Sequence, residues 1–152
     1  MDYFLKIDGI QGESADAKHK GEIELVSFGW GVDAETGGGS GGGGGGAGRA
    51  RFQPFHVTML TNKASPQLFL STVSGKHLKE ATLSVRRAGK QALEYLKIKF
   101  SEVFVTSFHE EAGHEPPTEL IAFDFGRIEI EYGAHGGGTE RAGWDVKKNV
   151  KI

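Results

Sequence analysis

Residues 96–108 read LKIKFSEVFVTSF, and this stretch decides the fold class. One face of it carries the apolar residues Leu96, Ile98, Phe100, Phe104 and Phe108, interrupted by Glu102 and Thr106. The opposite face carries Lys97, Lys99 and Ser101, followed by Val103 and Val105. Alternation of this kind is typical of a β-strand, because successive side chains point to opposite faces. The change from polar to apolar residues on the second face predicts a long strand that serves two environments.

The same alternation recurs through most of the chain and predicts about seven or eight strands. The other apolar rows are Tyr3/Leu5/Ile7, Ile23/Leu25, Val26/Phe28/Trp30, Phe55/Val57/Met59, Leu83/Val85, Ile121/Phe123/Phe125, Ile128/Ile130/Tyr132 and Trp144/Val146. The alternation slips by one residue after Leu25 and again at Gly126. Such slips predict a bulge or a bend between sheets at both places.

One helix is predicted between Ser65 and Gly75. Ser65 is the expected N-cap, Pro66 suits the first helical position, and Gly75 suits the residue just after the helix. Phe69 and Val73 are spaced i and i+4, so we expect them to dock on the sheet. Many strands with one helix predict a mainly β fold: a two-sheet β-barrel or sandwich with the helix alongside.

A glycine-rich tract runs from Gly37 to Gly48 in a chain of 152 residues. As a linker it would leave a first piece of roughly 35 residues, too short for a core of its own. We therefore predict one domain over 1–152, with a flexible extended loop at about 33–50. The tract matches the dinucleotide-binding glycine motif by chance, but Arg49–Phe52 leads into a strand where that site needs a helix.

The composition excludes several classes of function. There is no cysteine, so disulfides, thiol nucleophiles and thiolate metal sites are absent. The net charge is −2, which gives no reason to expect nucleic-acid binding. The N-terminus lacks the pattern of a signal peptide, and no apolar run suits membrane insertion. We expect no cofactor.

The segment from His109 to His114 nearly reads as the zinc-protease motif H-E-x-x-H. Its second histidine stands at i+5, off the face that the first would share, and Gly113 and Pro116–Pro117 oppose a helix. A polar loop between two strands is therefore expected, and a small metal-dependent hydrolase is the alternative. The remaining histidines His19, His56, His77 and His135 are scattered, and no G-x-S-x-G elbow is present.

Small residues form one face of the strand at Ser27, Gly29 and Gly31. Glycine weakens a strand, so this row needs an explanation. Either something approaches this face closely, or it lines a wall that must stay smooth, or the strand is distorted or at an edge.

Several segments, taken in order, resemble the Hcp family of type VI secretion systems. They are Phe4–Ser14, Ser27–Gly31, the glycine tract ending in Ala47-Gly48, Ser65–His77, Arg86–Gly89, Glu94–Leu96 and Ala142–Asn149. Each motif is weak alone, but their number and order make the resemblance specific. It covers nearly the whole chain.

The resemblance implies two β-sheets closed into a barrel, with a helix alongside, as in phage tail tubes. It implies a non-catalytic subunit that forms a homohexamer, with rings that stack into the inner tube. The implied partners are stacked rings of itself, a spike (VgrG-like) protein, a sheath and secreted effectors. The protein would be cytoplasmic before firing and then extracellular, without a signal peptide.

Two surfaces are hypotheses within this family reading. Ser27, Gly29 and Gly31 are expected to face the lumen and contact effectors. The ring-stacking loop is expected to include Asp33, Ala34, Glu35, Thr36, Gly37 and Gly48. Besides the hydrolase, a monomeric ligand-binding β-barrel and a tube subunit of another contractile particle stay open as alternatives.

Overall fold

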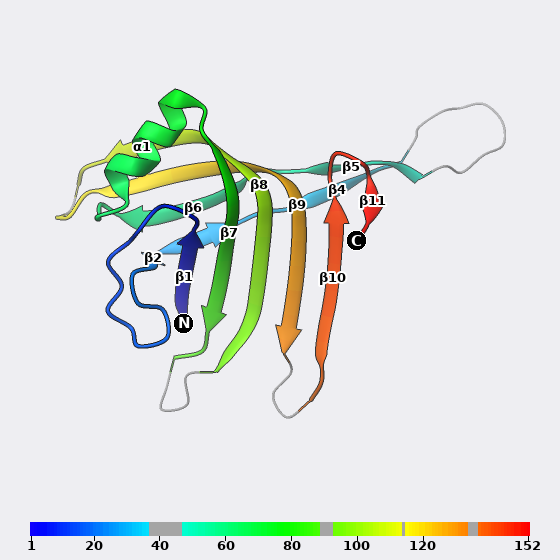
Figure 1. Ribbon diagram of the computed structural model, residues 1–152, viewed down its shortest axis with the longest axis horizontal. Coiled ribbons are helices and arrows are strands. Elements are labelled where there is room, and N and C mark those ends of the chain that lie inside the picture. The colour runs from blue at the N-terminus through cyan, green and yellow to red at the C-terminus, as the bar shows by residue number, and fades with distance from the viewer. Residues whose placement is uncertain (37–46, 89–92, 114, 134–136) are drawn as a thin grey trace.

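The computed structural model describes residues 1–36, 47–88, 93–113, 115–133 and 137–152. These residues form eleven strands and one helix (Figure 1). The strands of the first half are β1 (Asp2–Ile7), β2 (Ile23–Leu25), β3 (Ser27–Gly29), β4 (Val32–Thr36), β5 (Ala47–Phe52) and β6 (Phe55–Leu60). The second half contains α1 (Ser65–Ser74), β7 (His77–Arg86), β8 (Glu94–Glu111), β9 (Thr118–Gly133), β10 (Thr139–Asp145) and β11 (Val150–Lys151).

Nine strands belong to one branched antiparallel sheet, and β4 and β5 form a second sheet of two strands. The path through the large sheet is β11-β10-β9-β8-β7-β1-β2. β9 carries the branch, because its first half pairs with β6 and its second half pairs with β10. β3 then pairs with β6. The fold is mainly β in two sheets with one helix, as predicted, but the sheets are not closed into the barrel that the family resemblance implied.

A bend in β8 and β9 lets these two strands serve both halves of the large sheet. Glu102 in β8 has a positive φ of 55°. Gly126 lies beside it in β9, and a Cβ on Gly126 would come 3.0 Å from the Cβ of Glu102. The buried side of β8 therefore passes from Phe100 to Val103. The predicted slip at Gly126 is confirmed, whereas Phe104 does not share the face of Phe100 and is 37% exposed.

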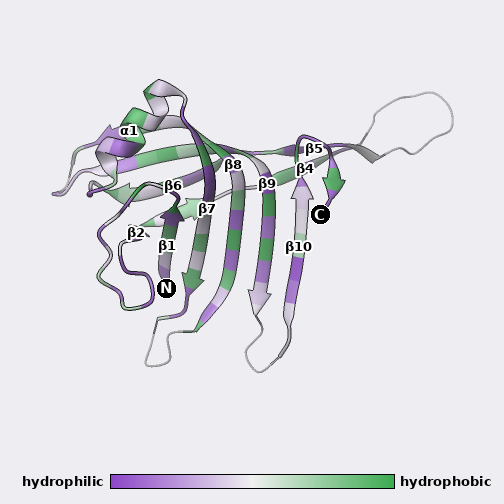
Figure 2. Ribbon diagram, viewed as in Figure 1, coloured by the Kyte–Doolittle hydropathy of each residue, from purple (hydrophilic) through white to green (hydrophobic). Residues whose placement is uncertain are grey.

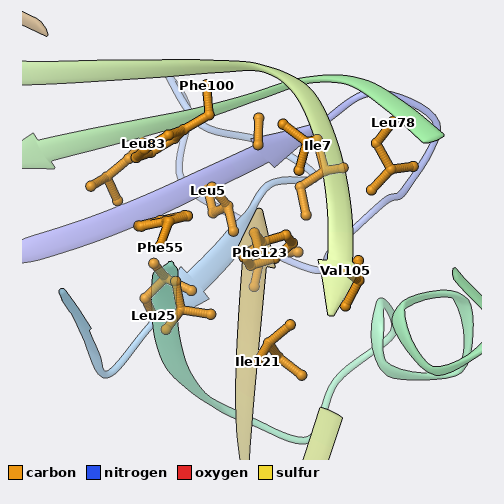
Figure 3. Packing of buried hydrophobic residues seen from close by; sticks show 14 of the residues in the cluster. Leu5, Ile7, Leu25, Phe55, Leu78, Leu83, Phe100, Val105, Ile121 and Phe123 are labelled. Carbon is orange, nitrogen blue, oxygen red and sulfur yellow. The ribbon is translucent and has the colours of Figure 1, made fainter. Parts of the chain in front are cut away.

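The core lies between the two halves of the folded sheet (Figure 3). The Phe55 ring stacks between Phe100 and Phe123, with centroid distances of 4.3 and 5.6 Å. All three side chains are fully buried. Each such side chain contributes roughly 1.5–3 kcal/mol through burial. Figure 2 shows the alternation of apolar and polar residues along β7, β8 and β9 that directs one side of each strand into this core.

The helix begins one residue earlier than predicted. Ser65 is its first residue, the N-cap position falls on Ala64, and Ser65 makes no capping hydrogen bond to the helix. Its hydroxyl instead donates to Glu119 Oε1 at 2.6 Å and accepts the N–H of Asn62 at 2.9 Å. Gly75 ends the helix in the left-handed conformation, as predicted. No helix in the described ranges is long and apolar enough to cross a membrane.

The face by which α1 docks was predicted wrongly. Leu68 and Ser71 face the sheet and are buried, whereas Phe69 and Val73 are 53% and 65% exposed. The Phe69 ring lies 6.2 Å from that of Phe108. The i and i+4 spacing selected Phe69 and Val73, but the side of α1 that packs on the core carries Leu68 and Ser71, spaced i and i+3.

Glu119 is a buried carboxylate under the start of α1. It is 1% exposed and lies on the core side of β9. Ser65 holds one of its oxygens, and the Thr61 hydroxyl lies 3.2 Å from the other. The same hydroxyl lies 3.2 Å from Glu110 Oε2. Burial raises the pKa of Glu119, the Ser65 hydrogen bond opposes that rise, and the nearby Glu110 adds to it.

The segment between β1 and β2 is pinned by close backbone packing at Gly12. The Gly12 N–H donates to the Gly21 carbonyl at 2.8 Å. A Cβ on Gly12 would lie 2.5 Å from the Glu22 carbonyl oxygen, which is backbone and cannot swing away.

Gly12→Ala should therefore lower the free energy of unfolding by about 1–3 kcal/mol, measured by urea denaturation at fixed protein concentration. Gly31→Ala is the matched control, because a Cβ there would sit 3.9 Å from the Gln53 side chain, an ordinary contact. The control should stay within about 0.5 kcal/mol of the wild type. Equal losses in the two variants would contradict this account of Gly12.

Glu119→Gln should stabilise the protein at pH 8 and lose that advantage near pH 4. The folded-state pKa of Glu119 is raised above the ordinary 4.5, so the ionised form weakens the fold as pH rises through that range. Glutamine keeps the shape without the charge. Thermal unfolding across this pH range measures the difference, with the exposed Glu111→Gln as control. An advantage of equal size at both pH values would show that the charge of Glu119 is not its cause.

Candidate assembly surfaces

The two-stranded sheet of β4 and β5 projects from the body as an arm (Figure 1). Val32 pairs with Phe52 and Asp33 with Arg51, and the register shifts beyond Ala34. The described side chains of β4 are exposed along the arm. Figure 1 shows the arm and α1 at opposite ends of the long axis of the molecule.

The base of the arm is tied to the segment after β10. The Arg49 guanidinium donates to the Val146 and Lys147 carbonyls at 3.3 and 3.1 Å. Gln53 donates to the Asp33 carboxylate at 3.3 Å. These bonds fix the direction in which the arm leaves the body.

The residues predicted to stack rings are therefore only partly in a loop. Asp33, Ala34, Glu35 and Thr36 lie in β4 and Gly48 lies in β5, so the flexible loop expected at 33–50 is a paired ribbon at its base. Gly37 lies outside the described residues. The alternation of Val32 and Ala34 with Asp33 and Glu35 was the signal for a strand, and the neighbouring glycine tract obscured it.

An uncovered face lies on the side of β3, β6 and β9 that points away from the core. The open face, as we name it, consists of two cross-strand rows. They are Ser27–Thr58–Leu120–His109 and Gly29–His56–Ala122–Ser107. Paired residues of antiparallel strands share a side of the sheet, so each row crosses four strands. No ion pair found among the described residues involves this face.

The small residues predicted as lumen-facing lie on or beside the open face. Ser27 is exposed, and Gly29 is partly covered by the ring of its cross-strand neighbour His56. A Cβ on Gly29 would lie 2.5 Å from His56 Nε2, so glycine makes room for that ring. Gly31 follows β3 and accepts the Gln53 N–H at 2.8 Å. The structure thus brings together Ser27 and Gly29 but leaves Gly31 outside the strand.

The segment that resembled a zinc motif is the end of a strand. His109 is exposed on β8, and His114 lies outside the described residues. In the ranges that the structure describes, no group of three or more histidine, aspartate and glutamate side chains is arranged to hold a metal ion. The interior that a ligand-binding barrel would need is filled by the side chains of the core.

Sequence reasoning missed an ion-pair cluster around Arg86. Arg86, near the end of β7, is 9% exposed. Its guanidinium lies 3.0 Å from Asp2 and 2.7 Å from Asp16, and 4.9 Å above the Phe4 ring. The hydrogen bond from Arg86 holds the pKa of Asp16 at about 2. The partners are 84 and 70 residues away, and no local pattern signals such pairing.

Comparison with known proteins identifies the family. The family model described as "Type VI secretion system effector, Hcp" matches residues 4–132. Protein hcp1 of Pseudomonas aeruginosa is 36% identical over an alignment of 160 positions, which covers 99% of this chain and 98% of that protein.

Similar solved structures support the same family assignment. Hcp1 from Salmonella typhimurium is 36% identical with a TM-score of 0.84, and the match covers 99% of this chain and 98% of the other. A type VI secretion system effector from Yersinia pestis is 35% identical with a TM-score of 0.81, covering 95% and 100%. The family consists of secreted structural tube proteins and not of enzymes. With a match over most of its length and this degree of identity, the chain belongs to the Hcp family of type VI secretion proteins.

Proposed function

We propose that this protein is a subunit of the inner tube of a type VI secretion system. Six copies form a ring, rings stack into the tube, and the tube carries effectors out of the cell beneath a spike and within a sheath. Before firing the subunit is cytoplasmic. Membership of the Hcp family supports the secretion role, and two surfaces of this chain support the assembly.

The projecting arm is the observation that carries the proposal. A two-stranded ribbon alone is marginally stable in water. β4 and β5 pair only with each other, and the described side chains of β4 are exposed. Such a ribbon needs another surface to pack against, and it points away from its own body (Figure 1). The next ring supplies that surface, so the arm is the stacking element.

The open face suits the wall of the lumen. Its rows combine small residues, hydroxyl groups, imidazoles and one leucine, Leu120, and its strands already bury their other, apolar side in the core. A channel wall that releases its cargo should offer contacts of modest strength, and a face of uncharged, mostly small or polar groups does so. The side chains project little from that wall at Gly29, Ser27 and Ala122. Its largest polar groups are His56 and His109.

Replacing Asp33–Gly48 by a short Gly-Ser turn should abolish tubes and leave single rings. The truncated chain keeps the large sheet and the core but loses the outer part of the arm. Negative-stain electron microscopy at several protein concentrations reads both states directly, with the wild type as reference. Wild-type protein that forms no hollow rings at any concentration would refute the proposed function. Tubes that survive the deletion would refute only the role of the arm.

Ser27→Trp should reduce effector retention by roughly tenfold or more, a cost of about 1.4 kcal/mol, while rings persist. Ser27 is exposed, so the larger ring would project from the open face. Ser27 is a better site for this test than Gly29, where any side chain first meets His56. Thr139→Trp, exposed at the start of β10, is the matched control. Co-purification of effector with the ring is the measurement, and equal retention in both variants would place the lumen elsewhere.

A further inference from the structure

A pocket of about 450 Å³ opens where the segment after β1 meets the end of β7 and the start of β8. Its cations are Lys6, Lys18, Lys97 and Lys99, and its floor includes the buried Ser84. We call this the cationic pocket. Lys6 of β1 and Lys97 of β8 reach it from the two strands that flank β7, since Thr82 of β7 pairs with Lys6 and Ser84 pairs with Lys97.

Most of the positive charge in the pocket lacks an internal partner. Lys99 pairs with Glu129 at 2.9 Å and Glu80 at 3.8 Å. For Lys6, Lys18 and Lys97, no carboxylate of the described residues lies within ion-pair distance. The remaining residues, 37–46, 89–92, 114 and 134–136, contain no aspartate or glutamate.

Two acids, Glu22 and Glu94, also line the pocket, and both lie near one histidine. Glu22 lies 2.9 Å from His19 Nδ1, and Glu94 lies 3.6 Å from His19 Nε2. His19 itself is 6% exposed and stacks on the Phe4 ring at 4.3 Å. Four lysines and two glutamates line the pocket, and Lys99 already pairs with acids outside it, so the lysines leave an excess of positive charge there. An anionic group entering the pocket would offset that excess.

The same chain carries an exposed acidic turn, which has the anionic groups that such a contact needs. Glu111 and Glu115 are exposed near the turn between β8 and β9 and form no ion pair within the described part of the chain. A backbone hydrogen bond fixes the turn to the segment after β6, because the Thr61 N–H donates to the Pro117 carbonyl at 2.9 Å. The Thr61 hydroxyl also holds Glu110.

The acidic turn cannot reach the pocket of its own molecule. Lys97 lies near the start of β8 and Glu111 is its last residue. Fourteen residues at about 3.3 Å each place them roughly 45 Å apart along the strand. Figure 1 shows the turn beside α1 and the start of β8 at the far end of the strand. Only a second copy can bring the two charges together.

We propose that the acidic turn of one copy docks in the cationic pocket of the next copy within the ring. The two patches differ, so the contact is heterologous, and such a contact closes into a ring when the rotation between copies permits. This inference rests on the proposed ring and adds the pair of surfaces that joins its subunits. The contact is electrostatic, so ring formation should weaken as salt rises.

Two charge-reversed variants test the proposal. Lys6→Glu/Lys97→Glu makes both the pocket and the turn acidic, and Glu111→Lys/Glu115→Lys makes both basic. Each variant alone should need at least a roughly tenfold higher concentration than the wild type to form rings, a shift worth about 1.4 kcal/mol per subunit. An equimolar mixture restores opposite charges at every contact only when the variants alternate. Native mass spectrometry should therefore show rings of three copies of each.

Two double reversals at exposed positions elsewhere provide the controls for net charge, because they change it by the same amount. Lys147→Glu/Lys148→Glu and Glu35→Lys/Asp124→Lys lie away from the pocket and the acidic turn, and rings should form as in the wild type. Circular dichroism checks that each variant is folded. If the wild type forms rings and both reversed variants also do so alone, this inference fails and the proposed function stands. If the wild type forms none, both fail. Intact rings that lose an acidic effector would assign the pocket to that partner and overturn the contact between copies.

Discussion

The bend shared by β8 and β9 is the constraint on which the rest of the structure depends. Glu102 takes a positive φ, which most residues avoid, and Gly126 beside it has no side chain to obstruct the turn. Past this point the buried phase of each strand changes, so one pair of strands can form part of both layers. Without the bend, Phe100 and Phe123 could not both pack against Phe55.

Folding a single branched sheet in this way creates two outer surfaces of different chemistry. The half built on β6 and β3 presents the open face, whose two rows contain no acidic residue, lysine or arginine and several small side chains. The half built on β7, β8 and β10 presents the charged face, where Lys99 pairs with Glu129 and Arg141 with Glu131. In the proposed tube, the surface passed by cargo and the surface met by neighbours would differ in their demands on charge, and the bend separates the open face from the charged face.

The strands and core of this protein follow from local alternation, and most of them could be predicted. The slip at Gly126 was visible because the apolar phase changes there. The corresponding change in β8 was assigned wrongly, since Phe104 and Phe108 seemed to continue the row of Phe100, and no pattern marks Glu102 as a residue with positive φ.

The ion-pair cluster around Arg86 and the open face were harder to predict than the strands, and the reason is different. Arg86 joins Asp2 and Asp16 from distant parts of the chain, and the open face is assembled from four strands. Periodicity reports which residues share a side of one strand, but it does not report which strands become neighbours. The family resemblance supplied the architecture, yet closure into a barrel did not hold for this chain.

A single copy leaves several features of this fold unsatisfied. β10 pairs with β11 only at Trp144 and Asp145, and Gly143 accepts the Ile152 N–H, so the residues of β10 from Thr139 to Ala142 form a sheet edge. Exposed edges invite uncontrolled pairing, and charged residues such as Glu140 and Arg141 limit it. In the same isolated copy most described side chains of the arm are exposed, and the cationic pocket keeps an excess of positive charge. These deficits lie on separate parts of the surface, so neighbours must approach from more than one direction. A closed ring that stacks meets that requirement, because each copy then has lateral neighbours as well as copies above and below it.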